Sequence, residues 1–242
     1  MSQFHLLSER RFWPLFWTQF LGAFNDNLFK NALAILVAYR SMTLLGIGSA
    51  TIVVACAGIF IFPFFLFSAT AGQLADRVAK WRLIRWVKIW EIGVMLLAGL
   101  GFALNSVGLL LGVLFLMGTQ SAFFGPAKYA ILPELLDDDS LVGGNALVAS
   151  ATFLAILIGT IVGGLVVAGG EVWVSRLGFM VVAVAGAGFL ASLFIIKTPP
   201  ANPDLHIDLN PVRPTVQILR VTRSVREVFL SVLAISWFWF LG

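Results

Sequence analysis

Residues 72–82 read "GQLADRVAKWR", a short charged segment between two long apolar runs, 47–71 and 86–104. Each run is close to, or longer than, the roughly 20 residues that an α-helix needs to cross the hydrocarbon core of a bilayer. The apolar residues are continuous, whereas a lipid-facing barrel strand would alternate polar and apolar positions. This stretch therefore predicts a polar connection between two transmembrane helices.

The same pattern extends over the rest of the chain. Hydrophobic residues make up 60% of the sequence and charged residues 12%, and the mean hydropathy is +0.96. Soluble domains usually carry roughly 25% charged residues. We predict an all-α polytopic membrane protein, a six-helix bundle followed by the start of a seventh helix. The further apolar runs are 12–39, 107–127, 141–168, 173–196 and 228–242.

Three domains follow from these runs. We expect a six-helix transmembrane bundle over 1–196, a cytoplasmic linker over 197–227, and the start of a seventh helix over 228–242. The linker is rich in proline and contains "TVQILRVTRSVREV", residues 215–228. This amphipathic, basic stretch is typical of a segment that lies on the inner membrane surface, with its arginines toward anionic headgroups.

The distribution of the 16 Lys and Arg residues predicts the orientation. If the N-terminus is cytoplasmic, all of them except Lys30, Arg40 and Arg176 fall in cytoplasmic segments, as the positive-inside rule requires. The net charge of +4 therefore reflects topology. We do not expect a nucleic-acid partner, because no water-facing segment is long enough to form a basic binding domain.

The segment 72–82 also resembles the signature that the major facilitator superfamily carries between its second and third helices. The matching residues are Gly72, Asp76, Arg77, Lys80 and Arg82. Ala79 stands where the signature has a second glycine, and Trp81 interrupts its basic pair. A glycine permits close approach to a neighbouring helix, and a carboxylate at a helix end accepts charge-assisted hydrogen bonds. We interpret the five residues as a conformational latch, although a charged loop would contain basic residues in any case.

Two further stretches are similar to the bacterial lysophospholipid transporters. They are "QFLGAFNDNLFK", residues 19–30, and "FFGPAKYAILPELL", residues 123–136. The resemblance implies twelve helices in two six-helix halves, with substrate passing between the halves. It also implies delivery of lysophospholipid from the outer to the inner leaflet of the bacterial inner membrane for reacylation. The implied partners are membrane lipids, a C-terminal six-helix half, and a fused or associated acyltransferase.

The first apolar run carries polar residues near its middle. On a helical period, Gln19, Asp26 and Lys30 fall on one face, with Asn27 and Asn31 beside it. A charge left unpaired at the bilayer centre costs roughly 2.5–3.5 kcal/mol on insertion scales, so such residues usually face a cavity and mark a transport path. We predict that this face lines a wet cavity and contacts a polar headgroup. The alternative is an Asp26–Lys30 pair that only neutralises itself.

Later helices contribute further candidates. Gln120 is a plausible hydrogen-bond donor in the cavity, and Lys128 fits either a phosphate ligand or an ordinary residue that reaches the inner headgroups. Glu91 fits a coupling carboxylate or, the reading we favour, a partner for a loop arginine. Gly159 and Gly163 are spaced for close helix packing.

No catalytic arrangement is visible in the sequence. His5 and His206 are isolated, and there is no phosphate loop or paired Cys or His for a metal. The "DDD" at 137–139 is read as a solvated turn. We therefore expect no enzyme, cofactor or metal within these residues. Two other functions remain open: a carrier or exporter for another small amphipathic or polar solute, and a membrane anchor for a fused lipid-acylating enzyme.

Overall fold

The computed structural model describes residues 3–41, 43–208, 210 and 212–241. The described residues are mainly helical and their only β pairing is an isolated bridge between Leu44 and Ile47, so the predicted all-α class is confirmed. The chain divides into two compact units, Met1–Leu205 and His206–Gly242. Each unit is described by itself.

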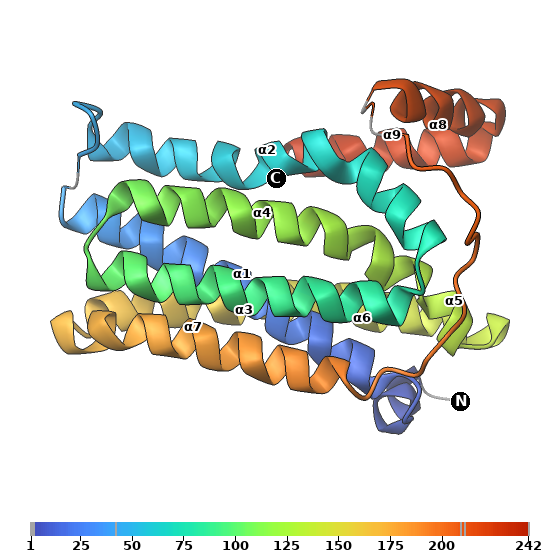
Figure 1. Cartoon of the computed structure of the whole chain (residues 1–242), viewed down its shortest axis with the longest axis horizontal. Helices are drawn as coiled ribbons and strands as arrows, with labels where there is room; N and C mark the ends of the chain where they lie inside the picture. Colours follow the sequence, from blue (N-terminus) through green and yellow to red (C-terminus); the bar gives the residue numbers. More distant parts are fainter. Residues whose placement is uncertain (1–2, 42, 209, 211, 242) are drawn as a thin grey trace. The chain divides into compact units, whose positions relative to one another are not determined.

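The first unit is a bundle of long helices joined by short connections (Figure 1). The short 3-10 helix η1 (Gln3–Ser8) precedes them, and the single turn α5 (Leu132–Leu135) lies between α4 and α6. The long helices are α1 (Trp13–Tyr39), α2 (Ser49–Arg77), α3 (Lys80–Ala103), α4 (Val107–Ala130), α6 (Asp138–Ala168) and α7 (Glu171–Ser192).

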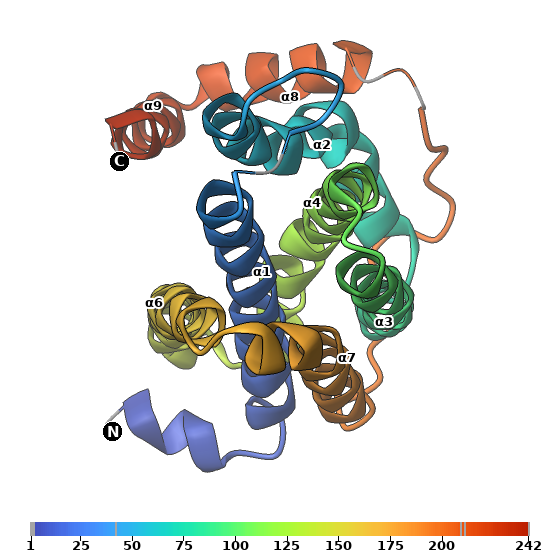
Figure 2. The same ribbon diagram turned by 90° about the vertical axis from the view of Figure 1, so that its left-hand side faces the viewer.

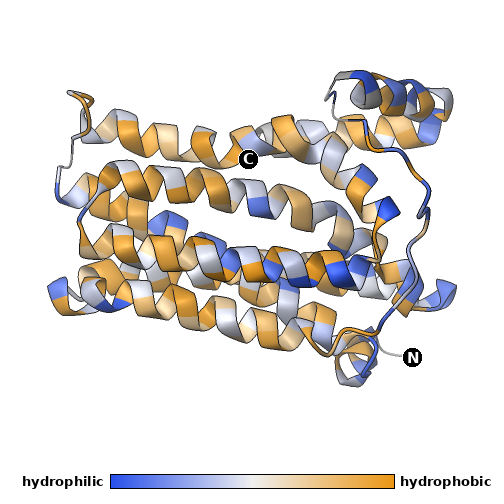
Figure 3. Cartoon of the chain, in the orientation of Figure 1, coloured by the Kyte–Doolittle hydropathy of each residue, from blue (hydrophilic) through white to orange (hydrophobic). Residues whose placement is uncertain are grey.

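Five of these helices, α2, α3, α4, α6 and α7, are long and apolar enough to cross a membrane. Figure 3 shows hydrophobic residues along most of their length. Helix α1 has 27 residues but is not among the five. The polar residues between Asn25 and Asn31 interrupt its apolar sequence.

Helix α1 lies inside the bundle, with contacts to α2, α4, α6 and α7 (Figure 2). Its polar residues are therefore enclosed by neighbouring helices. At one end of the bundle lie η1 and the α2–α3 and α4–α6 connections, and we call this the basic end. The α1–α2, α3–α4 and α6–α7 connections lie at the opposite end (Figure 1).

Glycines bring the most extensively contacting helix pairs together. A Cβ added at Gly159 or Gly163 of α6 would lie 2.7 or 2.9 Å from the carbonyl oxygen of Phe24 or Leu28 in α1. The predicted close packing at these glycines is confirmed. Such contacts matter in lipid, where helices associate by van der Waals packing rather than by the hydrophobic effect.

Two other helix pairs are built in the same way. In α4, a Cβ at Gly118 would overlap the carbonyl of Phe60 in α2. In α7, a Cβ at Gly178 would lie 2.6 Å from the Cα of Gly99 in α3. The α1–α6, α2–α4 and α3–α7 pairs therefore each depend on a position without a side chain.

Ion pairs connect the helix ends. At the basic end, Arg11 donates to Glu9 at 2.6 Å and to Asp137, the N-cap residue of α6, at 2.9 Å. The hydrogen bond from Arg11 lowers the pKa of the Glu9 carboxyl below its ordinary value. The predicted acidic turn at 137–139 thus begins a helix, where carboxylates interact favourably with the helix dipole. At the opposite end, Arg40 donates to Asn105 at 2.7 Å and to Glu171 at 2.6 Å.

The second unit contains α8 (Val212–Ser224) and α9 (Arg226–Leu241). Helix α8 is strongly amphipathic, and its exposed apolar side chains include Ile218 and Leu219. The predicted division into 1–196, 197–227 and 228–242 stays a prediction.

Candidate functional site

A cavity of about 360 Å³, lined by both polar and aromatic side chains, lies among α1, α2, α3, α4 and α6. Its lining includes all six residues that the sequence predicts to contact substrate: Gln19, Asp26, Asn27, Lys30, Gln120 and Lys128. The helical period placed the first four on α1, and the fold brings the last two beside them from α4. The structure thus gathers these side chains around one space, while their role in binding stays a prediction.

Asp26 lines this space and has one carboxyl oxygen without a hydrogen-bond partner among the described residues. Its Oδ2 accepts a hydrogen bond from the Ser121 hydroxyl at 2.7 Å. Its Oδ1 is buried and has no hydrogen-bond partner among the described residues. A buried acceptor without a donor is costly and calls for an explanation. A donor supplied by a bound substrate would satisfy it.

Lys30 does not pair with Asp26 in this structure. Its ammonium group lies over the ring of Phe60, 4.4 Å from the centroid, and no ion pair joins the two charges among the described residues. The alternative of a self-contained pair at four-residue spacing is therefore not what the structure holds. The Lys128 ammonium group likewise lies 5.0 Å from the Tyr129 ring centroid and is only partly exposed.

The cavity has an excess of positive charge. Its lining holds one carboxyl group, that of Asp26, and the amino groups of Lys30 and Lys128, which have no carboxylate within ion-pair distance among the described residues; Lys88 also lines it but is paired with Glu91. A low-dielectric space lined by one sign of charge attracts the opposite sign. The arrangement suits a headgroup that has an anionic part and a hydrogen-bond donor.

Two of the predicted residues are largely satisfied by the protein itself. Gln19 donates to the backbone oxygen of Val148 at 3.1 Å and accepts from the Thr152 hydroxyl at 3.0 Å, both in α6. Asn27 donates to the backbone oxygen of Ala23 at 2.7 Å. The Gln19 amide connects α1 to α6, whereas the Asn27 amide bonds within α1. Less of their hydrogen-bonding capacity therefore remains for a substrate.

Sequence reasoning missed a buried ion pair beside the cavity. The charge count assigned Lys88 to a cytoplasmic segment, yet it is 0% exposed and donates to Glu91 at 2.6 Å within α3. Glu91 is 1% exposed and pairs with this lysine rather than with a loop arginine. Opposite charges at three-residue spacing in an apolar run were the available signal.

Ser121 is the second residue that sequence reasoning missed. It follows Gln120 in α4 and contacts both Gln120 and Asp26. A serine inside an apolar helix carries no charge or spacing signal, because its hydroxyl often bonds to its own helix backbone. Only the packing of α4 against α1 reveals this contact.

The five predicted latch residues do not form one cluster. Gly72, Asp76 and Arg77 belong to the last turns of α2, whereas Lys80 and Arg82 begin α3, and only Val78 and Ala79 lie between the helices. A Cβ at Gly72 would meet nothing within 4 Å, so the expected close approach at this glycine is wrong. Asp76, Arg77 and Arg82 are exposed.

Lys80 has a partner that the signature did not predict. It is 3% exposed and pairs at 2.6 Å with Glu134 of α5, and so connects the start of α3 to the α4–α6 connection. The backbone oxygen of Asp76 accepts from the backbone nitrogen of Asn202 at 2.8 Å. Contacts at the basic end therefore join segments far apart in the sequence.

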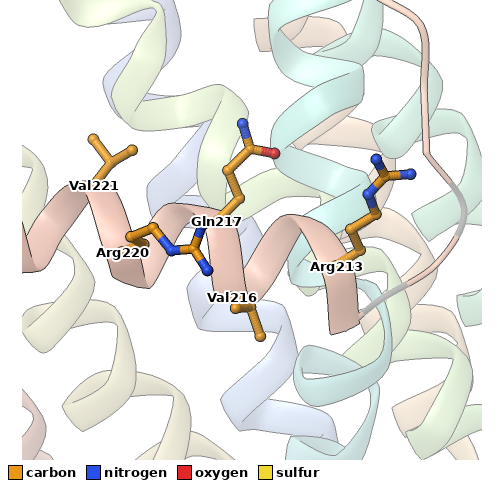
Figure 4. A pocket seen from close by; sticks show the side chains of 5 residues that line it. All are labelled: Arg213, Val216, Gln217, Arg220 and Val221. Carbon is orange, nitrogen blue, oxygen red and sulfur yellow. The ribbon is translucent and has the colours of Figure 1, made fainter.

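A second hollow lies beside α8 (Figure 4). Its lining consists of Arg213, Val216, Gln217, Arg220 and Val221, all exposed. They comprise two arginines, one glutamine and two valines, all from one helix. We interpret this as the surface of an amphipathic helix rather than as a binding site.

Comparisons with a family profile and with curated proteins agree on the family of this chain. A family profile described as Major Facilitator Superfamily matches residues 6–242. The chain is 34% identical over 231 residues to a protein named Lysophospholipid transporter LplT from Enterobacter sp. (strain 638), which covers 93% of this chain and 53% of that protein.

Other curated relatives carry the same name. The LplT of Salmonella gallinarum (strain 287/91 / NCTC 13346) is 33% identical over 236 residues, or 93% of this chain and 52% of that protein. The LplT of Citrobacter koseri (strain ATCC BAA-895 / CDC 4225-83 / SGSC4696) is 36% identical over 193 residues, or 76% and 43%. The chain spans about half the length of the curated relatives it matches.

Proposed function

The chain belongs to the Major Facilitator Superfamily, and from this premise we propose that it is the N-terminal six-helix half of a lysophospholipid transporter. In this proposal α1 is the sixth membrane crossing beside α2, α3, α4, α6 and α7, and α9 begins the seventh. A second six-helix half completes the protein. The substrate site then lies between the halves, near the middle of the membrane.

The observation that carries the proposal is the polar cavity. It combines one carboxyl group that has an unpartnered oxygen with two amino groups that lie over aromatic rings and form no ion pair among the described residues. A lysophospholipid headgroup offers a phosphate to Lys30 or Lys128 and a donor to Asp26. The name of the relatives supports this class of substrate. We further propose that transport runs from the outer to the inner leaflet of the bacterial inner membrane, for reacylation.

Orientation is part of the proposal. At the helix ends of the first unit, Lys and Arg residues gather at the basic end (Arg10, Arg11, Arg77, Lys80, Arg82, Arg85 and Lys197), whereas the opposite end has Arg40 and Arg176, which supports a cytoplasmic N-terminus. The basic, amphipathic α8 supports a linker on the inner membrane surface. Cysteine substitutions test the orientation: Ser140→Cys should react with a membrane-impermeant reagent only from inside, and Ser106→Cys only from outside. Reversed accessibility would contradict the topology.

The basic end also supports a conformational latch. We propose that Gly72, Asp76, Arg77, Lys80 and Arg82 rearrange with the transport cycle, as their position in the superfamily signature implies. The half-buried Lys80–Glu134 pair is the contact on which this depends. An ion pair between two connections can break and re-form when one group of helices moves against another.

Two other functions are distinguishable by the same variants. A carrier for another small solute would use the cavity but show no response to lysophospholipid. A membrane anchor for a fused acyltransferase or acyl-activating enzyme would need neither the cavity charges nor Asp26. Any such enzyme lies outside these residues.

The experiment is Asp26→Asn in the full-length protein. The change keeps the shape and polarity of the side chain but removes its charge. Uptake of labelled lysophosphatidylethanolamine by spheroplasts should fall roughly ten-fold or more, because a hydrogen bond to a charged group contributes about 1.5–3 kcal/mol. Protease resistance should stay unchanged. Unchanged uptake would favour the anchor.

The double variant Asp26→Asn with Lys30→Gln is the control. If Asp26 serves only to neutralise Lys30, the double variant should recover both stability and uptake. We expect it to be folded and inactive, because the two side chains contact different groups, Ser121 and Phe60. Recovery of uptake would reduce the pair to structural neutralisation and move the substrate contact to Lys128.

A further inference from the structure

The buried ion pair in α3 is connected to the cavity through amide side chains. Glu91 accepts hydrogen bonds from Lys88 at 2.6 Å, from Asn25 at 3.2 Å and from Gln120 at 3.3 Å. These donors come from α3, α1 and α4. The Lys88 ammonium group also lies 4.9 Å from the ring centroid of Phe124. The charge of Glu91 is thus held at a fixed place beside the cavity.

This fixed charge decides which way Gln120 points. Only the amide nitrogen of Gln120 can face a carboxylate, because the amide oxygen would repel it. The amide oxygen of Gln120 therefore points toward Ser121, whose hydroxyl lies 3.1 Å away. Glu91 thus orients Gln120 so that the amide oxygen of Gln120 is available as an acceptor for the Ser121 hydroxyl.

Ser121 has one hydroxyl hydrogen and two acceptors within reach. Its oxygen lies 2.7 Å from Oδ2 of Asp26 and 3.1 Å from Oε1 of Gln120. A serine hydroxyl donates only one hydrogen bond at a time. The shorter bond, to the Asp26 carboxyl group, is the stronger one, and it fixes the orientation of that group, whose other oxygen, Oδ1, is buried without a partner among the described residues.

We propose that Ser121 is a positioning residue for Asp26, and that Gln120, oriented by the Lys88–Glu91 pair, gives the Ser121 hydroxyl a second acceptor when a substrate draws the carboxylate toward itself. The hydroxyl then keeps a hydrogen bond in the empty and in the occupied cavity. This inference rests on the proposed function, because it assigns the orientation of the carboxylate that meets the headgroup.

The test measures binding of lysophosphatidylethanolamine to the purified full-length protein. Ser121→Ala should raise the dissociation constant about ten-fold, equivalent to about 1.4 kcal/mol. Ser121→Thr keeps the hydroxyl and should stay within about two-fold of the unmodified protein. The matched control is Ser192→Ala in α7, whose buried hydroxyl bonds to the backbone oxygen of Phe189 at 2.6 Å. It should leave binding unchanged.

A double-variant cycle separates positioning from a general loss of structure. Once Asp26 is replaced by alanine, Ser121 has nothing to position, so Ser121→Ala should not weaken binding further. If the dissociation constant of the double variant rises by the product of the two single-variant increases, the inference is overturned. A Ser121→Ala protein that binds the lipid normally would also overturn it. If the unmodified protein does not bind the lipid, the proposed function itself fails, and that result is distinct from either outcome of the cycle.

Discussion

Removing one member of the Lys88–Glu91 pair should destabilise the bundle more than removing both. The two side chains are 0% and 1% exposed and lie in the interior of a membrane-embedded helix bundle. Breaking a buried ion pair usually costs about 3–5 kcal/mol, because the remaining charge stays buried without its partner. Replacing both members with apolar residues of similar volume is often neutral.

The surroundings rank the two single variants. After Lys88→Met, Glu91 keeps the two amide donors of Asn25 and Gln120. After Glu91→Leu, the ammonium group of Lys88 loses its charged partner and keeps its contact with the ring of Phe124. We therefore expect Lys88→Met to cost about 3 kcal/mol and Glu91→Leu about 5 kcal/mol, the two ends of the usual range.

Denaturant titration of the full-length protein in mild detergent measures these differences. The double variant Lys88→Met with Glu91→Leu should recover to within about 1.5 kcal/mol of the unmodified protein, the usual limit for swaps that keep volume. A strictly additive loss in the double variant would refute the reasoning, since each loss would then come from packing rather than from a stranded charge. Lys88→Arg, which keeps the charge but not the shape, controls for size.

Three other predictions test particular contacts. Gly163→Leu should separate α6 from α1 and lower the free energy of unfolding by about 3 kcal/mol or more, because the new Cβ would lie 2.9 Å from a backbone oxygen of α1. Thermal unfolding would measure this loss of stability. Lys80→Gln should slow lysophospholipid uptake but lower the free energy of unfolding by only roughly 1 kcal/mol, because Glu134 is partly exposed. If the uptake rate and the amount of folded protein fall equally, the pair is not a latch. Arg40→Gln should cost at most about 1 kcal/mol, because Glu171 is exposed, yet raise the labelling rate of a cysteine at Ser106 by loosening that end of the bundle.

The sequence was sufficient for most of the helices because apolar length is a strong signal in membrane proteins. The sequence was less informative at the connection between α2 and α3. The predicted second span ended at residue 71, but α2 continues to Arg77, since a charged segment at the membrane surface can extend a helix as readily as end it. Gly72 was read as a close contact because of its place in the superfamily signature, but its surroundings are open.

The cavity was predictable only where the period of one helix applied. Gln19, Asp26 and Lys30 share a face of α1, so their common direction followed from spacing alone. Which residues of other helices meet them depends on packing, and Ser121 gave no sign of its contact with Asp26. Lys88 was misjudged because a charge count assigns every lysine near a helix end to water, and only the three-dimensional partner Glu91 shows otherwise.

The pairing of α1 with α6 sets a delay during synthesis. Thr152, which satisfies Gln19, follows it by 133 residues. At about 5–20 residues per second, the hydroxyl leaves the ribosome about 7–27 s after the amide that needs it. Over that interval α1 has its polar face without the α6 partners that later cover it. The nascent α1 should therefore stay close to the insertion machinery, or to lipid headgroups, until α6 has been synthesised and packs against it.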